Sequence, residues 1–144
     1  MNEAMNPNLR EKPAFLDENI KPLNELYKVN FIEKNTKINE NIEIRLFNGH
    51  TKGLISVFIN YKGKKVVFAG DVMPAVPYLR LPYVSAYDVF PLQSIEDKKQ
   101  MLKEIFDEDG IIFFQHDINT EACSLKETRK GYRENKLLKI EEID

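Results

Sequence analysis

Three strand-like runs of this sequence are each followed by a side chain that can bind a metal ion. The runs NIEIRLF, VVFAG and IIFFQ precede His50, Asp71 and His116. Loops at strand ends often carry functional residues, because the rigid sheet fixes their positions. Two imidazoles and a carboxylate are good ligands for zinc, iron or manganese. The pattern therefore predicts a metal site at His50, Asp71 and His116, although each could instead be an ordinary turn or capping residue.

Hydrophobic periodicity predicts the strands of a mixed α/β layer protein. In residues 41–47, Ile42, Ile44 and Leu46 share one face while Glu43 and Arg45 share the other, as in a half-buried strand. The other expected strands are 29–33, a hairpin of 54–61 and 64–69 around Lys62-Gly63, the buried run 111–115, and final strands 122–128 and 136–143. A sheet of this kind needs helices to cover it.

Two helices are expected. Residues 7–27 have amphipathic spacing, although Pro13 and Pro22 should break or kink the helix. Ser94 should cap the second helix, with Asp97 three residues later, and Gly110 should end it. The charges over residues 96–103 indicate a solvated helix face. Residues 73–91 should form a loop with little regular structure.

Composition limits the kind of protein. The 144 residues suit one domain over residues 1–144, and the formal charge of −2 argues against binding nucleic acid or an anionic membrane. The single cysteine, Cys123, cannot form an internal disulfide and is expected to be a buried small hydrophobe. No signal peptide and no apolar run of about 20 residues is evident. We therefore expect a cytoplasmic protein.

The runs NGHTKG, FAGD and FFQHD resemble the C-terminal half of a metallo-β-lactamase-fold hydrolase. The resemblance implies an α/β (α+β) fold, half of an αββα sandwich with a mixed sheet covered by helices. It also implies that His50 binds a first metal ion, Asp71 bridges two ions and His116 binds the second. In the complete family site the two ions, commonly zinc, generate hydroxide that attacks an ester or lactone-type bond.

The family's His-x-His-x-Asp-His loop, which supplies four further ligands, is absent, because His50 and His116 are the only histidines. Each ion would keep one histidine and a share of Asp71, whereas catalytic zinc normally has three protein ligands. We therefore expect weak or no activity from this chain alone. A single ion held by all three side chains is an alternative.

The resemblance implies a partner and leaves alternatives open. Half a sandwich exposes apolar sheet surface, so we expect a complementary N-terminal half or a second copy of the chain. A small-molecule substrate would bind once the site is assembled. The alternative functions are a non-catalytic interaction domain that retains the scaffold, or an unrelated α/β domain with coincidental motifs.

Three further residues each have two candidate roles. Tyr83 or Tyr87 could donate a hydrogen bond to a substrate carbonyl, but packing of these rings against the sheet is the more ordinary expectation. Asp117 could orient His116 or cap the next turn.

Overall fold

The computed structural model describes residues 2–25 and 29–143. By their contacts the residues divide into two units, Met1–Ile32 and Glu33–Asp144. The expectation of one partial domain over residues 1–144 stays a prediction. No helix within the described ranges is long and apolar enough to cross a lipid bilayer.

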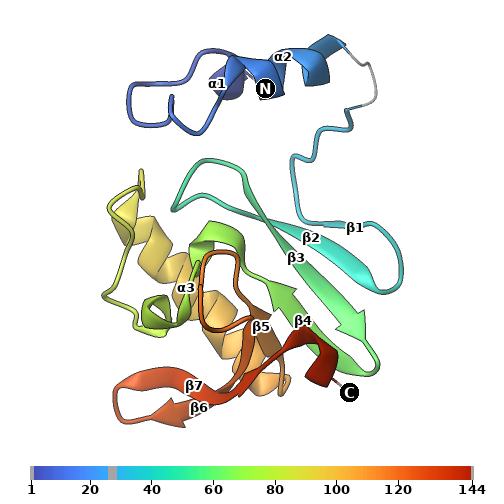
Figure 1. Cartoon of the computed structure of the whole chain (residues 1–144), viewed down its shortest axis with the longest axis vertical. Coiled ribbons are helices and arrows are strands. Elements are labelled where there is room, and N and C mark those ends of the chain that lie inside the picture. The colour runs from blue at the N-terminus through green and yellow to red at the C-terminus, as the bar shows by residue number, and fades with distance from the viewer. Residues whose placement is uncertain (1, 26–28, 144) are drawn as a thin grey trace. The chain divides into compact units, whose positions relative to one another are not determined.

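The first unit contains helices α1 (Asn2–Met5) and α2 (Asp17–Glu25) (Figure 1). The helix predicted over residues 7–27 is thus confirmed only in its second part. Asn8 Oδ1 instead accepts the backbone N–H groups of Arg10 and Glu11, which holds the preceding segment in turns. Pro22 lies inside α2 without ending it, and residues 26 and 27 of the prediction lie outside the described residues.

The second unit is built on a seven-stranded sheet in the order β1-β2-β3-β4-β5-β6-β7. Its strands are β1 (Thr36–Lys37), β2 (Ile42–Phe47), β3 (Leu54–Tyr61), β4 (Lys64–Phe68), β5 (Ile111–Phe113), β6 (Ala122–Thr128) and β7 (Gly131–Leu138). β4 and β5 pair in parallel and the other neighbours pair antiparallel. The predicted mixed sheet is confirmed.

Two strand predictions need correction. Residues 29–33 form no strand, and pairing begins only at Thr36, opposite Ile44. The last strand starts at Gly131 rather than at residue 136, because Gly131, with φ of +90°, closes a tight turn directly after β6. The 54–61/64–69 hairpin is confirmed, and its turn residues Lys62 and Gly63 both have positive φ, as a type I′ hairpin turn requires.

The long helix α3 (Pro91–Asp107) starts earlier than predicted. Proline suits the first helical position because its fixed φ matches the helix and its missing N–H would be unpaired there. Ser94 therefore lies inside the first turn, where its hydroxyl donates to the carbonyl of Phe90. At the other end the Gly110 N–H donates to the carbonyl of Ile105, close to the predicted end.

Short 3-10 turns complete the unit: η1 (Gly70–Val72), η2 (Val76–Leu79) and η3 (Ile140–Glu142). The rest of residues 73–90 is irregular, as predicted.

One face of the sheet packs on α3 and forms the main core. Cross-strand partners lie on the same face, and the row Phe58, Val67, Ile112 and Cys123 is almost completely buried. It packs with the α3 residues Met101, Leu102 and Ile105. Cys123 is therefore the buried small hydrophobe that was expected, and burial raises the pKa of its thiol to about 12.

The opposite face of the sheet is apolar and only half buried. The row Ile44, Val57, Phe68 and Phe113 crosses four strands with intermediate exposure, and Ile55 beside it is 43% exposed. Ile143, after η3, covers only the end of this face near Val66 and Ile111. The apolar side of β2 thus lies on this open face, and its charged side faces α3.

Arg45 explains how a charged side chain is accommodated on the α3 side of β2. Its guanidinium lies 4.0 Å from the centre of the Phe58 ring and pairs with Glu43 on its own strand and Glu104 on α3. These side chains are only 18–26% exposed. Arg45 therefore links the sheet to the helix.

Arg45→Met should destabilise the fold by about 2 kcal/mol, less than the loss for a fully buried pair because water reaches these groups. The hydrogen bond from Arg45 lowers the pKa of Glu43 below 4.5. The Arg45–Glu43 pairing therefore stabilises the fold above that pH and is lost as the pH falls through the lowered pKa. In urea unfolding, the difference in the free energy of unfolding between the wild-type chain and Arg45→Met should be smaller at pH 3 than at pH 7. Lys103→Met, which breaks an exposed pair with Asp107, should change stability by about 0.5 kcal/mol or less.

Candidate metal centre

The strand directions bring His50, Asp71 and His116 to one edge of the sheet. β2 and β4 both run antiparallel to β3, and β5 runs parallel to β4, so β2, β4 and β5 all point the same way. Each candidate ligand lies three residues beyond the end of its strand, at Phe47, Phe68 and Phe113.

The carboxylate of Asp71 lies between the two imidazoles. His50 Nε2 is 3.5 Å from Asp71 Oδ2, and His116 Nε2 is 3.2 Å from Asp71 Oδ1. The side chains of His50, Asp71 and His116 are 17%, 27% and 58% exposed. Each oxygen of the carboxylate thus faces a different imidazole nitrogen.

These two distances fit metal ligation in pairs. Ligands about 2.0–2.1 Å from a tetrahedral zinc ion lie about 3.4 Å from one another. The two N···O separations, 3.5 and 3.2 Å, are close to that length. However, no three His, Cys, Asp or Glu side chains among the described residues are placed to hold one ion together. The described side chains therefore offer two donor pairs that share Asp71, one with His50 and one with His116.

His50 is held by the backbone around it. The carbonyls of Gly49 and His50 accept the N–H groups of Phe90 and Val89, both at 2.9 Å. A Cβ atom on Gly49 would lie 2.4 Å from the Cα and N of Ser94. Gly49 is thus required by the close approach of α3. Gly70, with φ of +56°, provides a tight turn directly before Asp71.

Asp88 is a functional candidate to which no local sequence pattern assigns a role. Its Oδ1 lies 2.8 Å from His50 Nδ1, and its side chain is only 5% exposed. A carboxylate at Nδ1 favours the imidazole form that carries its proton there and leaves the Nε2 lone pair free for a metal ion. The two residues are 38 positions apart and no spacing rule links them.

His116 is placed by a backbone bond and by the turn that follows it. Its N–H donates to the carbonyl of Pro74 at 2.9 Å. The Asp117 carboxylate accepts three backbone N–H groups, those of Val76, Asn119 and Thr120. Burial acts to raise the pKa of Asp117, but these hydrogen bonds outweigh it and lower the pKa. Asp117 therefore caps the next turn, the second of its two expected roles.

Both loop tyrosines are exposed, whereas packing against the sheet was the more ordinary expectation. Tyr83 is 49% exposed and Tyr87 is 74% exposed. Arg80 lies 5.3 Å from the Tyr83 ring and donates to its hydroxyl. Contact of either tyrosine with a substrate stays a prediction.

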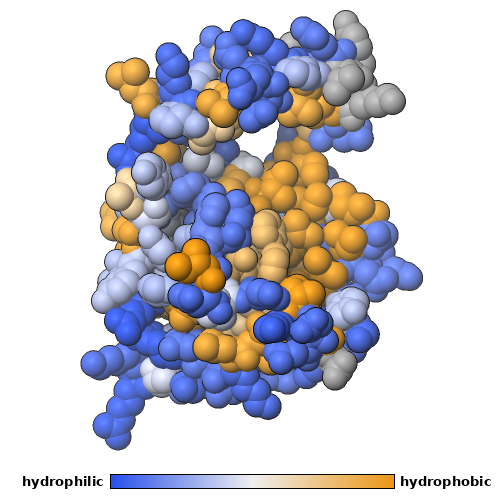
Figure 2. Space-filling view, viewed as in Figure 1, coloured by the Kyte–Doolittle hydropathy of each residue, from blue (hydrophilic) through white to orange (hydrophobic). Residues whose placement is uncertain are grey.

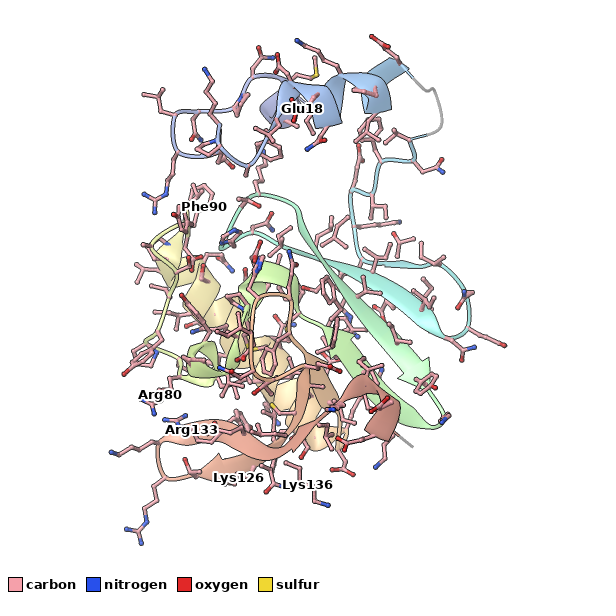
Figure 3. The ribbon with its side chains drawn as sticks, in the orientation of Figure 1. Glu18, Arg80, Phe90, Lys126, Arg133 and Lys136 are labelled. Carbon is pink, nitrogen blue, oxygen red and sulfur yellow. The ribbon has the colours of Figure 1, made fainter. Side chains whose placement is uncertain are left out.

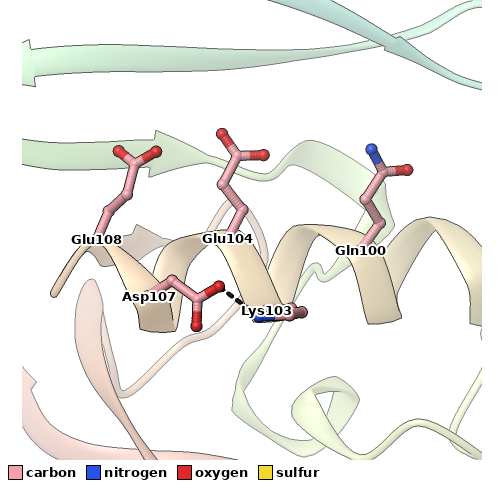
Figure 4. Close-up of a pocket in the computed structure, with 5 residues that line it drawn as sticks. All are labelled: Gln100, Lys103, Glu104, Asp107 and Glu108. Carbon is pink, nitrogen blue, oxygen red and sulfur yellow. Dashed lines mark hydrogen bonds and ion pairs between the residues drawn. The ribbon is translucent and has the colours of Figure 1, made fainter.

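A surface hollow along α3 does not coincide with this centre (Figure 4). It is lined by Gln100, Lys103, Glu104, Asp107 and Glu108. Three of its carboxylates pair with cations, Glu104 with Arg45, Asp107 with Lys103 and Glu108 with Lys65. It contains none of the candidate ligands.

The described structure thus combines a mixed sheet with two imidazoles and a carboxylate gathered at one edge. No family model and no curated protein matches this chain. A probable metal-dependent hydrolase from Staphylococcus aureus is 27% identical, with a TM-score of 0.80, over 96% of this chain and 50% of that one. A dizinc quorum-quenching lactonase, AidC, solved with a product, is 20% identical, with a TM-score of 0.72, over 94% and 47%. The hydrolase AbOPH of the beta-lactamase superfamily is 18% identical, with a TM-score of 0.74, over 95% and 50%.

The chain has the fold of the metal-dependent hydrolases of the metallo-β-lactamase superfamily, as its motifs predict. It spans about half the length of these solved structures, which is consistent with their C-terminal half.

Proposed function

We propose that this chain is the C-terminal half of a metal-dependent hydrolase, completed by an N-terminal half that supplies the remaining ligands. The observation that carries the proposal is the Asp71 carboxylate, which has His50 at one oxygen and His116 at the other. That arrangement suits a carboxylate that bridges two ions. The chain alone offers two donors per ion, so we expect little or no activity from it in isolation.

The residues would have separate tasks. His50 and Asp71 Oδ2 would hold one ion, and His116 and Asp71 Oδ1 the other, with zinc favoured and iron or manganese also compatible. Bound metal ions lower the pKa of water and polarise a carbonyl group, which is the chemistry needed to hydrolyse an ester or lactone. Asp88 would keep the Nδ1 proton of His50 in place. The fold shared with a solved lactonase supports this substrate class.

The open face of the sheet supports the same partner. The apolar row from Ile44 to Phe113 is half buried, and Figure 2 shows hydrophobic residues gathered over β2 and β3. Soluble proteins rarely leave large apolar patches uncovered. Because the chain covers about half of its solved relatives, we propose that the sheet of a complementary half packs here.

Co-expression with an N-terminal half that carries the His-x-His-x-Asp-His loop tests this function. We expect a one-to-one complex that hydrolyses an ester or acyl lactone, loses activity to a chelator and regains it with zinc. The chain alone should show little or no activity. Two results would instead favour a non-catalytic interaction domain. One is a chain that associates with itself and does not bind the added half. The other is a stable complex that binds zinc but hydrolyses neither substrate.

A further inference from the structure

Two adjacent charged residues in the N-terminal half of α3 are buried, against the expectation of a solvated face. Asp97 is 7% exposed and Lys98 only 1%. Charged side chains are rarely buried this far unless partners compensate them. Their partners should therefore reveal what they do.

Asp97 binds the backbone of the turn that contains His50. Its Oδ2 accepts the N–H groups of Asn48 at 3.1 Å and Gly49 at 2.9 Å, and its Oδ1 accepts from the Gln93 amide at 2.7 Å. The carboxylate is therefore bound to the main chain immediately before His50. An alanine side chain would leave both N–H groups without this charged acceptor.

Lys98 binds backbone carbonyls of the loop that leads to Asp88. Its Nζ donates to the carbonyls of Tyr78, Arg80 and Tyr83 at 3.2, 2.9 and 2.5 Å. Three carbonyls match the three donors of an ammonium group. Arg80 and Phe90 mark the two ends of the following loop in Figure 3, and Asp88 lies between them. Burial lowers the pKa of Lys98 to about 8, while the charge of Asp88 opposes that shift.

We propose that Asp97 and Lys98 are positioning residues that fix the orientation of the His50 imidazole from two sides. Asp97 holds the backbone before the ring, and Lys98 holds the loop whose Asp88 carboxylate accepts the hydrogen bond from Nδ1–H. The hydrogen bonds described for Asp97 and Lys98 go to other groups and not to the imidazole ring. The consequence for metal binding at Nε2 rests on the proposed function, but the orientation itself does not.

The imidazole tautomer in the metal-free chain tests this inference. Long-range proton–nitrogen NMR at a pH where imidazole is neutral distinguishes Nδ1–H from Nε2–H, and His116→Gln assigns the two histidines. The unsubstituted chain should show His50 in the Nδ1–H form. Lys98→Met and Asp97→Ala should each shift its two nitrogen resonances toward the averaged values of a mixed population.

Matched variants separate positioning from loss of stability. Lys99→Met, on the same helix with an exposed side chain, should leave the tautomer unchanged. Leu125→Ala, which removes a core side chain on β6, should lower stability without altering the tautomer. Lys98→Gln keeps a donor and serves if Lys98→Met does not fold.

Lys98 and Asp97 variants that fold and keep His50 wholly in the Nδ1–H form would overturn the inference. Because no metal or substrate is present, failure of the hydrolysis experiment would leave this result unaffected.

Discussion

Gly49→Ala should destabilise the fold by about 3 kcal/mol, the upper part of the usual range for overpacking. The added Cβ would meet the Cα and N of Ser94 at 2.4 Å, and these backbone atoms belong to α3. Relief of the clash requires the turn to move away from the helix. That movement would also break the hydrogen bonds from Asn48 and Gly49 to Asp97. Denaturant unfolding of both proteins measures the loss.

Gly53→Ala is the matched control. Gly53 lies in the same turn, with φ of +75°, but a Cβ there would meet no atom within 4 Å. Only the left-handed backbone opposes the substitution, at a cost of about 1–2 kcal/mol. Equal losses for the two variants would mean that α3 does not approach Gly49 as closely as described.

Asp71→Ala should have the largest effect on metal binding. In the proposed complex with an N-terminal half, Asp71 is the one residue of this chain that serves both ions. Residues that only orient a metal ligand contribute about 10–100-fold to affinity, so loss of the bridging carboxylate should cost about 100-fold or more. Hydrolysis should fall with metal content.

Metal analysis of the purified complex, followed by the ester or lactone assay, measures both effects. Asp107→Ala, which removes an exposed carboxylate paired with Lys103, should leave metal content and rate unchanged. An Asp71→Ala complex that retains both ions would exclude the bridging role.

The strand ends could be predicted from the sequence because the relevant signals are local. Alternation in residues 41–47 and the apolar run near residue 111 identified β2 and β5, and a ligand-type residue lies three residues beyond the end of each. The shared direction of β2, β4 and β5 then places these residues together. The resemblance to a known family added the expectation that Asp71 bridges two ions, which stays a prediction.

The residues that position the candidate ligands could not be predicted from the sequence, because their roles depend on tertiary contacts. Asp97 and Lys98 read as part of a solvated helix face, yet their partners lie in the His50 turn and the 78–83 loop. Asp88 contacts His50 although the two residues are 38 positions apart in the sequence. The pattern of β2 showed which residues share a face, but not that the charged face would meet α3 through Arg45 and Glu104.

The zinc content of the wild-type complex tests the central claim most directly. If Asp71 bridges two positions with His50 on one side and His116 on the other, elemental analysis of the purified one-to-one complex should give about two zinc ions per complex. His50→Ala and His116→Ala should each lower that content. A correctly assembled complex that holds no zinc, or whose zinc content is unchanged by both substitutions, would contradict the account.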